Sequence, residues 1–408
     1  NMRELGADVG LGAAKFGEIN GQAALDLPVI ADKFALRFAG SYVKSDGYYK
    51  LGACYGPIAN IGGVVPGITG TSGCGSGEDA GGQDVKNARV KALWNVTDSL
   101  TAFLQYEFMR DRSDAVPAYN DTPPGTAPYV WNFLNITRPP VDPLRNMGST
   151  QRNDQLIRMA EGQELDVDGV YLNLDWKLSD SYTVYSSTGY RKQYEHLPNT
   201  YAGAAPIFQS GPNAGRPFSL FDASRDTDRD TFQQEVRLAS SLSGPVNYVV
   251  GAFYQRNDAR FCVVQYVGLV DTFIGGTTFN DTPQLLCHKQ KSDSLAGYLD
   301  GSWDVNDRLQ LGAGFRMTRD KKEWSGRPKV FYNLLGPGVQ LSDLRDPLDA
   351  ADFAKYPTGV VDKTTPGYDN LEETWTEPSW RVTGSYKFTP DVFGYATVSR
   401  GYKAGGYN

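Results

Sequence analysis

The chain has 408 residues, of which 40% are hydrophobic, 12% aromatic and 21% charged. It contains no run of about 20 apolar residues, which excludes a helical membrane protein. The net charge of −7 argues against nucleic-acid binding, which requires a basic surface. The aromatic content argues against bulk disorder, because disordered chains are poor in aromatic residues.

Apolar and polar residues alternate with a period of two along most of the chain, which predicts β-strands with one apolar and one polar face. The predicted strands, at about 10 residues, exceed the usual length of about 5–6. In chain order the pattern predicts thirteen strands, at roughly 5–15, 20–28, 33–44, 86–97, 99–110, 168–178, 182–195, 231–242, 246–258, 292–304, 308–320, 376–388 and 392–403.

The connections between these strands alternate between short polar turns and long stretches rich in Gly, Pro, Asn and Asp. Only the first hairpin, near Phe16–Asn20, has a short loop where a long one is expected. Short turns at one end and long loops at the other are typical of an outer-membrane β-barrel. The long connections are Ser45–Val85, Asp111–Asp166, His196–Asp230, Ala259–Ser292 and Lys321–Thr374, and a helical turn is allowed at Leu341–Tyr356.

A soluble sandwich shows the same alternation, but with the apolar face in a core. Strand length and the regular placement of the long loops favour the barrel, in which the apolar face contacts lipid and the polar face lines the lumen. The side chains predicted to face lipid are Trp176, Leu299, Trp303, Leu311, Phe315, Val382 and Tyr386. The side chains predicted to face the lumen are Arg37, Asp175, Arg237, Arg316, Arg381 and Lys387.

Five segments carry a resemblance to a known family. Residues 34–49 read FALRFAGSYVKSDGYY, residues 232–241 read FQQEVRLASS, and residues 247–255 read NYVVGAFYQ. The hairpin at 295–320 and the final SRGYKAGGYN at 399–408 complete the set. All five resemble, in order, strand motifs of TonB-dependent outer-membrane receptors.

The resemblance implies an all-β, antiparallel transmembrane barrel of roughly 22 strands with short periplasmic turns and long extracellular loops. Residues 1–408 are then expected to form a barrel fragment of about 13 strands, without the plug domain and the last strands. The implied location is the outer membrane of a Gram-negative bacterium. The implied partners are outer-membrane lipid, the TonB energising complex, which acts through the plug, and an iron chelate or similar small ligand.

The function implied by the resemblance is energised uptake of a scarce, bulky nutrient, most commonly a ferric siderophore. Haem, cobalamin and oligosaccharides stay open as ligands. The alternative is a passive porin or substrate-specific diffusion channel. A plug sequence upstream of Asn1 distinguishes the receptor from the porin.

The four cysteines form two local pairs, Cys54 with Cys74 and Cys262 with Cys287, each bracketing a polar loop. The C-x-x-C spacing of metal sites is absent. Two disulfides in extracellular loops are therefore predicted over four free thiols, since disulfides persist outside the cytosol.

No catalytic, metal or cofactor site is predicted, and the chain is not expected to be an enzyme. The two histidines, His196 and His288, lie near loops without a catalytic signature, and neither a G-x-S-x-G element nor a P-loop occurs. The RDTDRD run at 225–230 lacks the spacing of a calcium loop.

Aromatic and cationic residues in and beside the long connections are the candidate binding residues. Aromatic rings offer a large contact area at little entropic cost, and cations hold an anionic ligand. A vestibule for an anionic iron chelate is therefore one interpretation; loop packing with an aromatic girdle at the membrane interface is the other. The candidates are Tyr119, Trp131, Arg138, Arg191, Tyr194 and Trp324.

Overall fold

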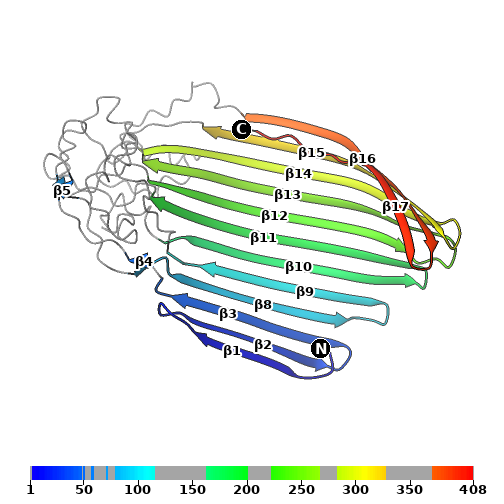
Figure 1. Cartoon of the computed structure of the whole chain (residues 1–408), viewed down its shortest axis with the longest axis horizontal. Coiled ribbons are helices and arrows are strands. Elements are labelled where there is room, and N and C mark those ends of the chain that lie inside the picture. The colour runs from blue at the N-terminus through cyan, green and yellow to red at the C-terminus, as the bar shows by residue number, and fades with distance from the viewer. Residues whose placement is uncertain are drawn as a thin grey trace.

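The computed structural model describes residues 2–47, 49–50, 57–58, 70–71, 79–114, 162–200, 222–266, 283–327 and 370–407. These residues form one antiparallel sheet of thirteen strands, and no membrane-spanning helix occurs among them (Figure 1). The strands of this sheet are β1 (Gly6–Ala13), β2 (Ile19–Ile30), β3 (Phe34–Ser45), β8 (Gln83–Asn95), β9 (Leu100–Asp111), β10 (Glu164–Ser179), β11 (Tyr182–Thr200), β12 (Asp222–Ser240), β13 (Val246–Tyr266), β14 (Pro283–Asp304), β15 (Leu309–Arg327), β16 (Asn370–Thr389) and β17 (Val392–Arg400).

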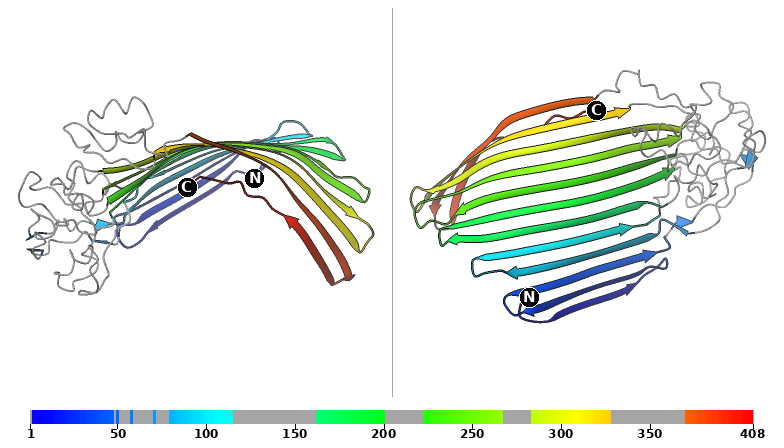
Figure 2. Two further views of the ribbon diagram at one scale, coloured as in Figure 1. Left: turned by 90° about the horizontal axis from the view of Figure 1, so that it is seen from above. Right: turned by 180° about the vertical axis from the view of Figure 1, so that it is seen from behind.

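Each strand pairs with the next strand of the sheet along the chain, so the topology is a simple meander. The sheet is strongly curved, and β1 and β17 form its two unpaired edges, so the sheet is partial and not closed (Figure 2). Between β3 and β8 lie two short ladders, which pair β4 (Tyr49–Lys50) with β7 (Asp79–Ala80) and β5 (Pro57–Ile58) with β6 (Gly70–Thr71).

The short turns are stabilised by their own polar side chains. The Asn306 carboxamide oxygen accepts hydrogen bonds from the backbone N–H groups of Arg308 and Leu309, both at 2.9 Å. The hydroxyl of Thr97 accepts the N–H of Leu100 at 3.0 Å in the same way. Such Asx and Ser/Thr turns satisfy backbone donors locally, which lets the chain reverse without losing the register of the ladder.

The register separates the side chains into two faces, because residues directly opposite each other in an antiparallel pair project to the same side. One register line runs through Trp176, Val184, Leu238, Val250, Leu299, Phe315 and Trp380. All seven residues predicted to face lipid lie on this side, which we call the apolar face. They are between 37% exposed (Leu311) and 53% exposed (Leu299 and Val382), so no core covers them.

The six residues predicted to face the lumen all lie on the opposite side, the polar face. Asp175, Arg237 and Arg316 belong to one register line that passes through Tyr185, Gly251 and Tyr298. The predicted segregation of the two faces is therefore confirmed, as is the number of strands in the sheet.

The strands extend further toward the long loops than predicted. β12 begins at Asp222 instead of 231, β13 ends at Tyr266 instead of 258, and β14 begins at Pro283 instead of 292. The prediction was wrong here because apolar alternation stops where charged residues begin, whereas the backbone ladder continues. The allowed helical turn at Leu341–Tyr356 lies outside the described residues.

The extended strands change the setting of one predicted disulfide. Cys262 and Cys287 are direct register partners within β13 and β14, so they lie in paired strands and not in a loop. Cα atoms of opposed residues in an antiparallel pair are about 4.5–5.5 Å apart, a distance that a disulfide can span. Cys54 and Cys74 lie outside the described residues, and both pairings stay predictions.

We expect a Cys262–Cys287 disulfide to be recovered by peptide mapping under non-reducing conditions. Replacing both cysteines by Ser should lower the free energy of unfolding by about 3 kcal/mol, since the bond restricts the unfolded chain. Replacing only one should cost a similar amount. Four free thiols in the map of the oxidised protein would contradict the pairing.

Candidate functional site

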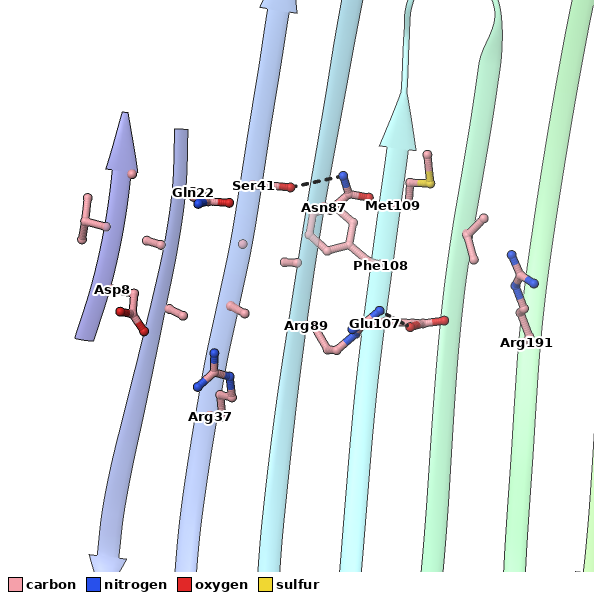
Figure 3. Close-up of a pocket in the computed structure, with 18 residues that line it drawn as sticks. Asp8, Gln22, Arg37, Ser41, Asn87, Arg89, Glu107, Phe108, Met109 and Arg191 are labelled. Atoms are coloured by element: carbon pink, nitrogen blue, oxygen red, sulfur yellow. Dashed lines mark hydrogen bonds and ion pairs between the residues drawn. The ribbon is translucent and has the colours of Figure 1, made fainter. Parts of the chain in front are cut away.

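A hollow of about 760 Å³ lies on the polar face near the β1 edge (Figure 3). Its walls come from β1, β2, β3, β8, β9 and β10, and Arg191 reaches it from β11. The charged residues that line it are Asp8, Arg37, Arg89, Glu107 and Arg191. The hollow therefore presents three guanidinium groups against two carboxylates.

Glu107 on β9 is the centre of a polar network in this hollow. Its carboxylate accepts hydrogen bonds from Arg89 at 3.2 Å, from the hydroxyl of Tyr171 at 2.9 Å and from Gln105 at 3.3 Å. The three donors come from β8, β10 and β9 itself. Because the carboxylate has several partners, its position on the wall is fixed and its charge is largely compensated.

The arginines of the polar face differ in whether they have a partner. Arg37 donates to its register partner Asp26 at 2.5 Å. Arg381 forms a two-point contact with Asp300 at 2.9 and 3.0 Å. Arg191 is exposed, and within the described part of the chain no ion pair is formed by its guanidinium. Arg191 is thus the cation in the hollow that is available to an anionic ligand.

Two glycines let side chains cross over an intervening strand. Tyr298 on β14 lies over Gly251 on β13 and donates to Glu235 on β12 at 2.6 Å. A Cβ atom at Gly251 would lie 2.4 Å from the Tyr298 ring, so any larger residue there must displace the ring. Gly314 plays the same role on β15, where a Cβ atom would lie 2.3 Å from the Asp300 carboxylate.

An aromatic row lies on the polar face at the long-loop end of the sheet. Ring centroids are 5.2 Å apart between Phe261 and His288, 6.1 Å between His288 and Trp324, and 6.2 Å between Trp324 and Tyr407. The row connects β13, β14 and β15 to the segment that follows β17. Burial lowers the pKa of His288, so its imidazole is neutral at neutral pH and acts as an aromatic surface.

The structure places three of the six candidate binding residues. Arg191 lines the hollow, and Trp324 belongs to the aromatic row on the same face. They lie on β11 and β15, four strands and thus about 19 Å apart. Tyr194 projects from the apolar face, because Tyr190, Lys192 and Tyr194 alternate with Arg191 along β11. Tyr119, Trp131 and Arg138 lie outside the described residues.

The sequence did not predict a role for Glu107, Glu235 or Tyr298, because binding residues were expected only in and beside the long connections. A usable signal was present, however. A glycine inside a strand marks a close approach of another group, and Gly251 lies opposite Tyr298.

Neither histidine belongs to a group of metal-ligating side chains in the described part of the chain. His196 lies in β11 and contacts its register partner Asp226, and His288 lies in the aromatic row. In the segments that the structure describes, no group of three or more His, Cys, Asp or Glu side chains is arranged to hold a metal ion.

A protein-family model described as TonB dependent receptor-like, beta-barrel matches residues 93–408. The chain therefore belongs to the family of TonB-dependent receptors, which are transporter receptors of the Gram-negative outer membrane. No curated protein sequence matches the chain.

Solved structures of this family share the fold. The ferric yersiniabactin uptake receptor FyuA from Yersinia pestis is 14% identical to this chain, with a TM-score of 0.56. The match covers 98% of this chain and 46% of FyuA. The ferric-catecholate import receptor Fiu from E. coli K12 is 12% identical, with a TM-score of 0.53, and the match covers 97% of this chain and 54% of Fiu. The copper transporter OprC is 14% identical, with a TM-score of 0.51, and the match covers 98% of this chain and 45% of OprC. This chain thus spans about half the length of these receptors.

We expect Gly251→Val to destabilise the sheet by about 1–3 kcal/mol, because the added methyl groups displace the Tyr298 ring and break its bond to Glu235. The matched control is Gly297→Val on β14, where nothing lies within 4 Å of an added Cβ. Urea unfolding in lipid vesicles measures both. Equal stability of the two variants would show that the Tyr298 crossing contributes nothing.

The two faces should respond oppositely to a new charge. Leu299→Arg places a cation on the apolar face in the bilayer and should cost about 2–4 kcal/mol. Gln233→Arg adds the same charge on the polar face, where the side chain is already exposed, and should cost little. Unfolding free energies in vesicles test this, and the assignment of the faces fails if Gln233→Arg costs more.

Proposed function

We propose that the receptor carrying this chain imports a scarce, bulky nutrient by energised transport, and that the nutrient is an anionic metal chelate of the ferric-siderophore class. The polar face supports this proposal, since it combines an aromatic row with Arg191, an exposed arginine that forms no ion pair within the described part of the chain. An arginine can hold an anionic chelate through charge-assisted hydrogen bonds, and aromatic rings can contact its apolar parts.

The relatives support the class of ligand without identifying it. Two of them are receptors for ferric yersiniabactin and for ferric catecholates, and a third is a copper transporter. Metal uptake is the feature that these names share. Energy would come from the TonB complex acting through a plug domain in the lumen, which the polar face of this sheet would enclose.

Uptake of labelled ferric chelates, cobalamin and oligosaccharides should be compared in cells with and without the gene for this receptor. We expect import of a ferric chelate that requires the gene and stops when an uncoupler collapses the proton gradient. Undiminished import after the collapse would contradict energised transport.

The proposed contact between Arg191 and the ligand has its own test. Arg191→Gln should weaken binding of the imported chelate about tenfold or more, as expected for a lost hydrogen bond to a charged group. Lys177→Gln, which removes one charge at the turn end of β10, serves as the control. If both variants bind like the unmodified receptor, Arg191 is not a ligand contact even though transport itself is unaffected.

A further inference from the structure

The contact between Arg381 and Asp300 is an ion pair that crosses a whole strand of the polar face. Asp300, Gly314 and Arg381 are register partners on three successive strands, β14, β15 and β16. The two charged residues are therefore two strand spacings, about 10 Å, apart. Their side chains still meet at 2.9 and 3.0 Å, because Gly314 has no side chain. A Cβ atom at Gly314 would lie 2.3 Å from Asp300 and 3.3 Å from the Arg381 side chain, so the pair lies directly over the glycine.

The same order of residues occurs in the hollow near the β1 edge, but no ion pair crosses the strand there. Glu107, Gly169 and Arg191 are register partners on β9, β10 and β11, again a carboxylate, a glycine and an arginine. Because glutamate is longer than aspartate, the two charged side chains could reach each other. Within the described part of the chain, however, Glu107 pairs with Arg89 at 3.2 Å, and Arg191 forms no ion pair.

The two sites differ in Tyr171, which is present only at the second. Its ring lies over Gly169, since a Cβ atom there would lie 2.7 Å from the Tyr171 hydroxyl oxygen and 2.9 Å from the ring. Gly189 on β11, the register partner of Tyr171, leaves room for the ring on the other side, because a Cβ atom there would lie 3.2 Å from it. The space that the ion pair fills over Gly314 is thus filled by a phenol over Gly169.

The Tyr171 hydroxyl also occupies one oxygen of the carboxylate. It donates to Oε1 of Glu107 at 2.9 Å, whereas Arg89 and Gln105 donate to Oε2 at 3.2 and 3.3 Å. Both carboxylate oxygens therefore have donors without any contribution from β11. Removal of the phenol would leave Oε1 without its donor and would open the space over Gly169 to a guanidinium from the next strand.

We propose that Tyr171 is a positioning residue that keeps Arg191 apart from Glu107 and thereby keeps this arginine available to an anionic ligand. The ligand part of this inference rests on the proposed function, in which Arg191 contacts the anionic chelate. Without the phenol, Arg191 and Glu107 would pair with each other, as Arg381 and Asp300 do. A ligand would then have to break that pair before it could bind, and its affinity would fall accordingly.

The pairing state of Arg191 is measured without any ligand through its reaction with phenylglyoxal, which modifies guanidinium groups, followed by peptide mapping of the full receptor in detergent. We expect Tyr171→Ala to slow the modification of Arg191 roughly threefold to fivefold, the protection that an exposed ion pair provides. The double variant Tyr171→Ala/Glu107→Gln should restore the original rate, because it lacks the carboxylate that would take Arg191. Misfolding would not be reversed in this way, since the second substitution does not replace the lost ring.

Ligand binding gives a second readout, in which ferric tris-catecholate, an anionic chelate, is titrated against the same three proteins. Its dissociation constant should rise by a similar factor in Tyr171→Ala and return to the original value in the double variant. The matched control is Tyr185→Ala, which removes another tyrosine of the polar face whose ring also contacts an arginine, Arg237, at 5.0 Å. This control should change neither the modification rate of Arg191 nor the dissociation constant.

The two readouts separate the role of Tyr171 from the identity of the ligand. An unmodified receptor that does not bind the chelate would contradict the proposed class of ligand, and the phenylglyoxal rates would still decide the role of Tyr171. Equal modification rates of Arg191 in the unmodified receptor and in Tyr171→Ala would overturn that role. A reduced rate that Glu107→Gln fails to restore would overturn it as well.

Discussion

Backbone hydrogen bonds between neighbouring strands are the interaction on which this structure depends. Inside a bilayer no water is present to satisfy an N–H or C=O group, and each unpaired group costs several kcal/mol. The meander meets this constraint locally, since every strand pairs with its neighbour in the chain. Within the described sheet, β1 and β17 are the edge strands, and each pairs on one side only.

Once the ladder is fixed, the two faces follow from the pleat, and each face has its own chemistry. On the apolar face, side chains such as Leu299 and Val382 are exposed because lipid, not a protein core, covers them. On the polar face, charges are compensated by neighbouring strands, as in the pair of Arg381 and Asp300. Strand glycines permit this, because Gly251 and Gly314 leave room for a side chain to cross a whole strand.

The ladder also continues past the part of the strands in which apolar residues alternate, and the aromatic row lies in that extension. The aromatic row around His288 and Trp324 lies on the polar side of the extended strands, and Lys192 lies on the opposite side. Because side chains alternate with a period of two, neighbouring residues of one strand present different chemistry on the two sides of the sheet.

The sequence alone determined the number of strands, their order and the face of each alternating residue, because these depend on a local period of two and on turn residues such as Asn306. It also predicted the family from short strand motifs. It did not determine where the strands end, because the apolar signal stops at the membrane boundary while backbone pairing does not. Nor did it find Glu107 or the crossing of Tyr298 over Gly251, and it grouped Tyr194 with Arg191. Those contacts depend on the register between strands and on which side chains converge across it, and only the tertiary structure decides both.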